Sequence, residues 1–132
     1  MSNKTVLVVE DDANVRLGFD VLLKAHHYDV LLAADALSAV NEAGTHQPDL
    51  IILDLGLPTG DGFILLERFG AMPTLSTIPV IVVSGRDVRG NKVRALKAGA
   101  KAFLQKPWND EELLAIVGEL LDEPELSAPL SE

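Results

Sequence analysis

The 132-residue sequence contains no cysteine, so it offers no disulfide, no thiolate metal site and no thiol nucleophile. A chain of this kind is compatible with a reducing compartment, and we expect it to be cytoplasmic. The sequence also lacks any apolar run near the roughly 20 residues that a membrane-spanning helix needs. Its first four residues lead directly into a strand-like run rather than a signal peptide. We therefore expect a soluble protein that is neither secreted nor bound to a membrane.

Positive charge is scarce in this chain. Eleven Lys and Arg residues stand against twenty Asp and Glu residues, and the net charge is −9. Such a charge repels phosphate backbones and anionic lipid, so we expect no direct binding of nucleic acid by this chain. The acidic excess is compatible with binding of a divalent cation, although most acidic residues only keep a surface solvated.

The apolar residues predict one α/β domain. They make up 48% of the sequence, enough for one core in a chain of this length. Five short apolar runs predict strands buried on both faces: Thr5–Val9, Val30–Ala33, Leu50–Leu53, Val80–Val83 and Ala102–Leu104. Each run is followed by a segment with apolar residues at helical spacing, for example Val93 and Leu96 in the fourth. The (βα)₅ order predicts a parallel sheet with helices on both faces.

Residues that cap helices stand at the expected boundaries. The predicted N-caps are Asp35, Asp61 and Asn109, the last in a capping box with Glu112. Left-handed C-caps are expected at Gly44 and Gly99, which follow the second and fourth helices. Helical periodicity ends near Leu121, so we expect a domain over residues 1–121 and an acidic, proline-containing tail or linker start over residues 122–132.

Polar side chains follow four of the five predicted strands. They are Glu10, Asp11 and Asp12 after the first strand, Asp54 after the third, Ser84 after the fourth, and Lys106 just beyond the fifth. In open parallel sheets the functional crevice lies beyond the carboxyl ends of the strands. We therefore expect these groups to share one rim of the sheet, except Asp12, which we expect to serve the N-terminus of the next helix.

The chemistry of this rim favours a metal ion and a phosphoryl group. Several carboxylates at one point repel one another unless a cation or a shared proton offsets their charge, and hard oxygen ligands suit Mg²⁺. Because Mg²⁺ takes few carboxylates and keeps several waters, such a site stays open to a phosphorylated ligand. A lysine and a hydroxyl are suitable partners for phosphoryl oxygens. Together these groups are the parts of aspartyl-phosphate chemistry.

The residues that carry these groups also form recognisable motifs. They are VLVVEDD (6–12), PDLIILDLGLP (48–58), Asp61-Gly62, VIVVSG (80–85) and ALKAGAKAFLQKP (95–107). In order and spacing the set resembles the response-regulator receiver domains of two-component signalling, over about Thr5 to Leu121. The resemblance implies a flavodoxin-like fold whose five-stranded parallel sheet has the order 2-1-3-4-5.

The resemblance also implies a role for each residue of the metal site. Asp54 would be the phosphoryl acceptor and a ligand of Mg²⁺. Asp11 would bind the ion directly, Glu10 mainly through a bound water, and Gly56 through its backbone carbonyl.

Three further residues would act on the phosphoryl group and on the switch. Lys106 would pair with the phosphoryl oxygens, and Ser84, at a position where threonine is as usual, would be the hydroxyl drawn toward them. Phe103 occupies the switch-aromatic position, where the family more often has tyrosine. Because phenylalanine has no hydroxyl, any hydrogen bond made by such a tyrosine is absent here.

The implied function is that of a signalling switch rather than an enzyme with a turned-over substrate. Asp54 would accept its phosphoryl group from a sensor histidine kinase or a histidine phosphotransfer protein, and slow autodephosphorylation would reset the domain. The fourth helix, fifth strand and fifth helix would present the output face to an unidentified downstream protein, with a phosphorylation-dependent dimer as one form of output.

Two other functions are compatible with parts of this pattern. A haloacid-dehalogenase-like phosphatase also uses a strand-end aspartate and Mg²⁺, but it needs a general acid two residues after the nucleophile, where this chain has Gly56. A receiver-like module that binds partners without being phosphorylated is the other alternative. The presence of Asp11, Asp54, Ser84 and Lys106 argues against it.

Overall fold

The structure, a computed structural model, describes residues 3–57, 62–85 and 88–121. Strands and helices alternate along the chain in these residues: β1 (Thr5–Val9), α1 (Ala13–Ala25), β2 (Asp29–Ala33), α2 (Ala36–His46), β3 (Leu50–Asp54), α3 (Gly62–Ala71), β4 (Val80–Ser84), α4 (Val88–Lys97), β5 (Ala102–Gln105) and α5 (Asp110–Leu120). The predicted strands are confirmed to within one residue at each end. The expected boundary at residue 121 remains a prediction, since residues 122–132 lie outside the described part of the chain.

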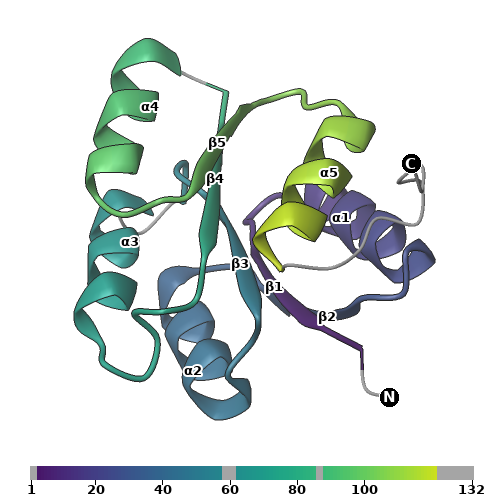
Figure 1. The fold of residues 1–132 in the computed structure, drawn as a ribbon, viewed down its shortest axis with the longest axis horizontal. Coiled ribbons are helices and arrows are strands. Elements are labelled where there is room, and N and C mark those ends of the chain that lie inside the picture. Colours follow the sequence, from purple (N-terminus) through teal and green to yellow (C-terminus); the bar gives the residue numbers. More distant parts are fainter. Residues whose placement is uncertain (1–2, 58–61, 86–87, 122–132) are drawn as a thin grey trace, which may run out of the picture.

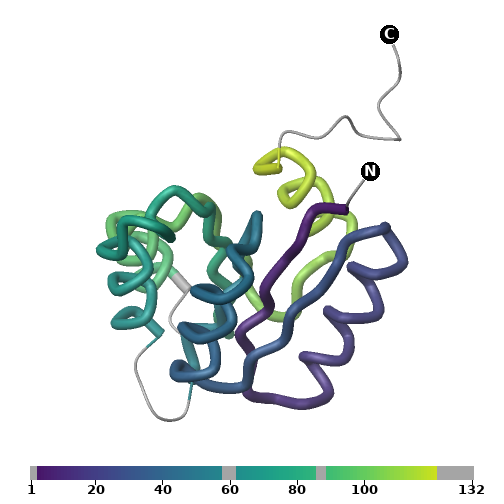
Figure 2. Tube along the Cα trace, turned by 90° about the horizontal axis from the view of Figure 1, so that it is seen from below, coloured from purple at the N-terminus to yellow at the C-terminus, as the bar shows by residue number. Residues whose placement is uncertain are grey.

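The strands form one parallel sheet of order β2-β1-β3-β4-β5, as predicted. Helices α1 and α5 cover one face of the sheet, and α2, α3 and α4 cover the other (Figures 1 and 2). Because side chains alternate along a strand, each strand contributes to two core layers. In β1, Leu7 and Val9 pack in the layer beneath α2, α3 and α4, and Val6 and Val8 pack in the layer beneath α1 and α5.

The two core layers explain the composition of the strands. Strands β3 and β4 are buried along their whole length, so both faces of each strand need apolar side chains. A stacked ring pair closes the layer beneath α1 and α5, where the rings of Phe19 and Trp108 lie 4.3 Å apart at an angle of 12°. Every helix in the described residues is too short or too polar to span a bilayer.

Most of the predicted helix caps are present. Asp35 caps α2 in a capping box with Ser38, and the Asn109 carboxamide accepts a hydrogen bond from the backbone N–H of Glu112, at 2.9 Å. Gly99 follows α4 with a φ of 110°, in the region that favours glycine. The predicted cap at Asp61 lies outside the described residues.

The prediction of a C-cap at Gly44 is wrong. Helix α2 continues to His46, and Gln47 takes the left-handed conformation with a φ of 50°. The Gln47 side chain donates a hydrogen bond to the Gly44 carbonyl at 3.2 Å, and its backbone N–H donates to the carbonyl of Ala43. These bonds satisfy carbonyls at the helix end and offset the strain of a left-handed glutamine.

The helical spacing of Val93 and Leu96 does not reflect burial. Val93 is 55% exposed and Leu96 is 43% exposed, so the two residues face outward on α4. Among the α4 side chains that the structure describes, only Ala95 is buried. The described side chains of α4 therefore contribute little apolar surface to the core.

Gly62 lets α3 begin directly against the end of β3. A Cβ atom at this position would lie 2.6 Å from the Cα atom of Leu55 and 2.9 Å from its carbonyl oxygen. These atoms belong to the backbone, so they cannot move aside as a flexible side chain could. The close approach places the start of α3 beside Asp54, whose carbonyl oxygen would lie 3.0 Å from the same Cβ.

We predict that Gly62→Ala lowers the free energy of unfolding by about 1–3 kcal/mol, because the added methyl group overpacks a rigid backbone contact. Gly18→Ala is the matched control, since a Cβ at Gly18 meets no atom within 4 Å and alanine favours a helix. The control should raise stability by about 0.5–1 kcal/mol. Urea unfolding of both variants checks this. Equal effects of the two substitutions would show that the contact at Gly62 carries no strain.

Candidate functional site

Strand alternation brings three charged side chains to one side of the sheet. Glu10, Asp54 and Lys106 stand at the carboxyl ends of β1, β3 and β5. In each strand, the residue two positions earlier packs in the core layer beneath α1 and α5; these residues are Val8, Ile52 and Leu104. Because the side-chain period of a strand is two residues, all three charged groups leave the sheet in the same direction.

The three groups form a compact ion cluster. The Lys106 Nζ atom lies 2.9 Å from Glu10 Oε1 and 3.4 Å from Asp54 Oδ2. Glu10 is only 1% exposed and Asp54 only 6%, whereas Lys106 is half-buried. One ammonium group therefore faces two carboxylates that are almost fully removed from water.

Backbone N–H groups fix the two carboxylates. The second oxygen of Glu10 accepts a hydrogen bond from the N–H of Asp12 at 3.1 Å, and Asp54 Oδ1 accepts one from the N–H of Gly56 at 3.1 Å. Each buried carboxylate thus has one oxygen on the backbone and the other near Lys106. This arrangement orients both groups before any ligand is present.

Asp11 adds a third carboxylate at the mouth of the cluster. Ligand oxygens of Glu10, Asp11 and Asp54 lie within 4.8 Å of one another, close enough to share one metal ion. Asp11 is exposed, so the cluster opens to solvent on its side. Asp12 points elsewhere: it caps α1 by accepting hydrogen bonds from the N–H groups of Asn14 and Val15, as predicted.

The cluster changes the pKa values of two of its members. Burial raises the pKa of Glu10 from 4.5 to about 7, even though hydrogen bonds from Lys106 and from the N–H of Asp12 lower it. For Lys106, burial lowers the pKa, but the hydrogen bond to Glu10 and the negative charge of Asp54 outweigh this and raise it. The lysine therefore stays charged, and it is the one ammonium group beside three carboxylates in this cluster.

Ser84 and Phe103 lie on the other side of the sheet ends. The Ser84 side chain is 4% exposed, and its Oγ accepts a hydrogen bond from Asn91 Nδ2 at 3.3 Å. Phe103 is half-buried and packs against the core layer beneath α2, α3 and α4. The roles of Ser84 and Phe103 in switching remain predictions, as does the role of the Gly56 carbonyl.

The structure also places two residues at the site that the sequence did not indicate. Arg16 Nη1 donates hydrogen bonds to the carbonyl oxygens of Glu10 at 2.9 Å and Asp11 at 3.2 Å, which holds the turn that carries both carboxylates. Asn91 reaches Ser84 from α4. Of the two, only Arg16 could have been proposed from the sequence, because it is a basic residue one turn into the helix that follows Glu10 and Asp11.

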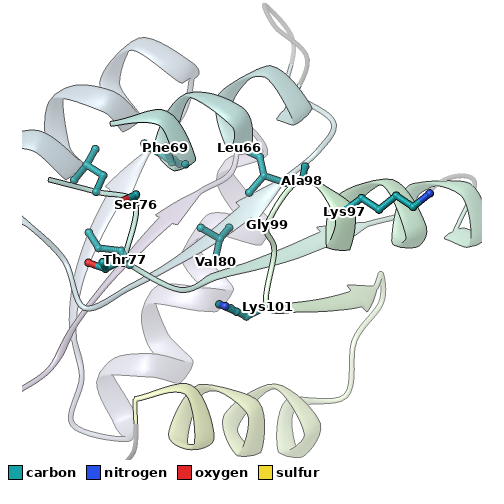
Figure 3. Close-up of a pocket in the computed structure, with 12 residues that line it drawn as sticks. Leu66, Phe69, Ser76, Thr77, Val80, Lys97, Ala98, Gly99 and Lys101 are labelled. Atoms are coloured by element: carbon teal, nitrogen blue, oxygen red, sulfur yellow. The ribbon is translucent and has the colours of Figure 1, made fainter. Parts of the chain in front are cut away.

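A separate cleft of about 350 Å³ lies at the opposite end of β4 (Figure 3). Its lining includes Leu66, Phe69 and Val80, with the lysines Lys97 and Lys101 at its margin. Among the described residues no carboxylate lines it, and Val80 is the first residue of β4 whereas Ser84 is the last. The cleft is therefore distinct from the ion cluster.

Comparison with known proteins identifies the family. Residues 6–118 match the model of the response regulator receiver domain, and the chain belongs to this family. It is 40% identical over 116 residues to the response regulator PleD of Caulobacter vibrioides, an alignment that covers 87% of this chain and 25% of PleD. The chain thus spans about a quarter of the length of that relative.

Solved structures agree with the fold. A response regulator from Chloroflexus aurantiacus has a TM-score of 0.88 at 30% identity, covering 92% of this chain and 100% of that one. The receiver domain of the sensor histidine kinase PA1611 from Pseudomonas aeruginosa, described with a magnesium ion in its active site cleft, has a TM-score of 0.84 at 27% identity, with coverages of 92% and 100%. The predicted family and the flavodoxin-like fold are both confirmed.

We predict a pH-dependent loss of stability that depends on Glu10. The pKa of Glu10 is raised in the folded protein when no metal is bound. Glu10 therefore stabilises the folded state fully below about pH 4.5, and this contribution to the free energy of unfolding is lost as the pH rises through about 7. Relative to Glu10→Gln, the native chain should lose about 2–3 kcal/mol of unfolding free energy between pH 5 and pH 8. Urea unfolding in EDTA at both pH values measures the difference. If the unfolding free energies of the two proteins changed equally with pH, the group with the raised pKa would not be Glu10.

Proposed function

We propose that this chain is a phosphoacceptor switch in which Asp54 receives a phosphoryl group in the presence of Mg²⁺. The observation that carries the proposal is the ion cluster. Asp54 is buried and held by a backbone N–H, and its Oδ2 atom lies 3.4 Å from Lys106 Nζ. Ligand oxygens of Asp54, Glu10 and Asp11 also lie within 4.8 Å of one another. Membership of the receiver family supports the same chemistry.

Asp54 is suited to act as the nucleophile. The oxygen that accepts the hydrogen bond of Gly56 is engaged with the backbone, and the other lies toward Lys106. In the proposed step, a carboxylate oxygen attacks phosphorus in line, an O–P bond forms, and the P–N bond of a phosphohistidine breaks. The bonding pair leaves with the imidazole of the donor. The Lys106 ammonium can then offset negative charge on the transferred oxygens.

The carboxylate cluster fits a magnesium ion. Asp11 and Asp54 would bind it directly, Glu10 would act mainly through a bound water, and the Gly56 carbonyl would complete the protein ligands. The three carboxylates are hard oxygen donors, and their surplus charge over Lys106 favours a divalent cation. When bound, Mg²⁺ supplies charge neutralisation for the phosphoryl oxygens. The magnesium ion described in the PA1611 receiver domain supports this assignment.

The remaining parts of the proposal concern signalling. The phosphoryl donor would be a sensor histidine kinase or a histidine phosphotransfer protein, in the cytoplasm. Ser84 would turn toward the phosphoryl group and Phe103 would follow, which biases α4, β5 and α5 between two arrangements. That face would then bind a downstream protein or a second copy of the chain. Turnover would be limited to self-catalysed phosphorylation and slow autodephosphorylation.

We predict a single Mg²⁺-dependent phosphoryl adduct on the native chain after incubation with acetyl phosphate. Intact-protein mass spectrometry detects the added mass, and Asp54→Asn should show none because an amide is not a comparable nucleophile. EDTA should prevent the adduct on the native chain. If a known receiver is modified under the same conditions and this chain is not, the phosphoacceptor function is wrong, and a module that binds partners without phosphorylation explains the receiver fold better.

We predict that Asp11→Asn weakens Mg²⁺ binding about tenfold or more, because it removes a charged ligand from the cluster. Asp12→Asn is the matched control: it removes the neighbouring charge, and asparagine is an equally good N-cap for α1. The control should change the dissociation constant by less than about threefold. Calorimetric titration with Mg²⁺ compares the two. Equal losses in both variants would mean that only the general field of the acidic turn attracts the ion.

A further inference from the structure

Polar contacts contribute to holding helix α4 to the domain. Ala95 is its only described side chain that is buried, so little apolar area fixes the helix. Its described polar contacts include a hydrogen bond that Asn91 Nδ2 donates to Ser84 Oγ at 3.3 Å, and the Arg94 guanidinium lies 3.9 Å from the centre of the Phe63 ring. Arg94 joins α4 to α3, whereas Asn91 joins it to the end of β4. A change at Ser84 therefore acts directly on α4.

The Ser84 side chain leaves the sheet on the side of α4. Val82, two residues earlier in β4, packs in the core layer beneath α2, α3 and α4, and the period of two continues to Ser84. Asp54 lies on the opposite side by the same reasoning, since Ile52 packs beneath α1 and α5. The hydroxyl of Ser84 must consequently turn away from α4 to reach a phosphoryl group on Asp54.

We propose that Asn91 is a positioning residue for the Ser84 hydroxyl. While Asp54 is unmodified, the Asn91 amide holds the hydroxyl on the side of α4. When Asp54 is phosphorylated, the hydroxyl turns toward the phosphoryl oxygens and gives up the bond to Asn91. Helix α4 then loses one of the contacts that hold it. This inference rests on the proposed function and names the residue that carries its signal to α4.

The hydrogen-bonding capacity of the groups supports the exchange. A serine hydroxyl has one donor and two acceptor positions, and it serves Asn91 as an acceptor. Toward a phosphoryl oxygen it would serve as a donor. Hydrogen bonds to charged acceptors are stronger than those between neutral groups, so a phosphoryl group outcompetes the Asn91 amide for the position of the hydroxyl. Without that group, the amide contact prevails.

The test is a double-mutant cycle on a phosphoryl analogue. The affinity for beryllofluoride in the presence of Mg²⁺ is measured for the native chain, Asn91→Ala, Ser84→Ala and the double variant, for example through the fluorescence of the single tryptophan, Trp108. Asn91→Ala should bind about two- to tenfold more tightly than the native chain, which corresponds to the loss of one neutral hydrogen bond. In the Ser84→Ala background the same substitution should have no effect.

Two controls separate positioning from general effects on the helix. Lys92→Ala, at an exposed neighbouring position of α4, should leave the affinity unchanged. The side-chain amide signal of Asn91 in NMR spectra of the unmodified protein, assigned by its loss in Asn91→Ala, should shift in Ser84→Ala. Thermal unfolding of each variant verifies that it is folded.

The outcomes distinguish this inference from the function on which it rests. A native chain that binds no beryllofluoride with Mg²⁺ overturns the proposed function and, with it, the role of Asn91. If the native chain binds but Asn91→Ala has the same effect in both backgrounds, only the role of Asn91 is overturned. Weaker binding by Asn91→Ala that depends on Ser84 would also overturn it, because Asn91 would then direct the hydroxyl toward the phosphoryl group.

Discussion

The interaction on which the site depends is the contact of one lysine with two buried carboxylates. Removing a carboxylate from water costs several kcal/mol unless a partner compensates it. Lys106 offsets one charge, while Glu10 and Asp54 are both nearly inaccessible and Asp11 stands close to them. Burial is the main cause of the raised pKa of Glu10, and the negative charge of Asp54 adds to it. A divalent cation at this point would offset the excess of carboxylates over the single ammonium group.

The parallel topology makes this contact possible. Glu10 and Lys106 are 96 residues apart in sequence, yet the strands that carry them end at the same edge of the sheet. Backbone bonds then fix the details: the N–H of Lys106 donates to the carbonyl of Ser84 at 2.9 Å, which ties the lysine to the end of β4. The ion cluster on one side of the sheet and the Ser84–Asn91 contact on the other therefore share one backbone frame.

Much of this arrangement could be predicted from the sequence because it depends on local patterns. Buried parallel strands are short apolar runs. The polar groups at their carboxyl ends lie at the same edge of the sheet regardless of the length or conformation of the connecting loops. Helix boundaries were less predictable: Gly44 favoured an earlier end of α2, but the side chain and backbone of Gln47 complete the hydrogen bonds of a longer helix. The contacts of Arg16 and Asn91 depend on distances between elements, which periodicity does not encode.

Helix α4 shows why apolar spacing alone misleads. Val93 and Leu96 recur at helical spacing, yet both are exposed, whereas Ala95 packs in the core and Asn91 and Arg94 make polar contacts. Few buried apolar contacts favour low local stability, so we expect α4 to open more readily than α3, which buries Phe63, Leu65, Leu66 and Phe69. Among the side chains that the structure describes, the helix that contacts Ser84 through Asn91 is thus the one with the fewest buried residues.

The central claim, that surplus buried negative charge prepares this site for a cation, is tested most directly by thermal unfolding of the native chain and Asp54→Asn with and without Mg²⁺. In EDTA the variant should be the more stable protein, because one repelling charge is gone while Lys106 still pairs with Glu10. Mg²⁺ should raise the melting temperature of the native chain clearly and that of the variant much less. A variant that is less stable in EDTA and gains as much from Mg²⁺ as the native chain would contradict the account.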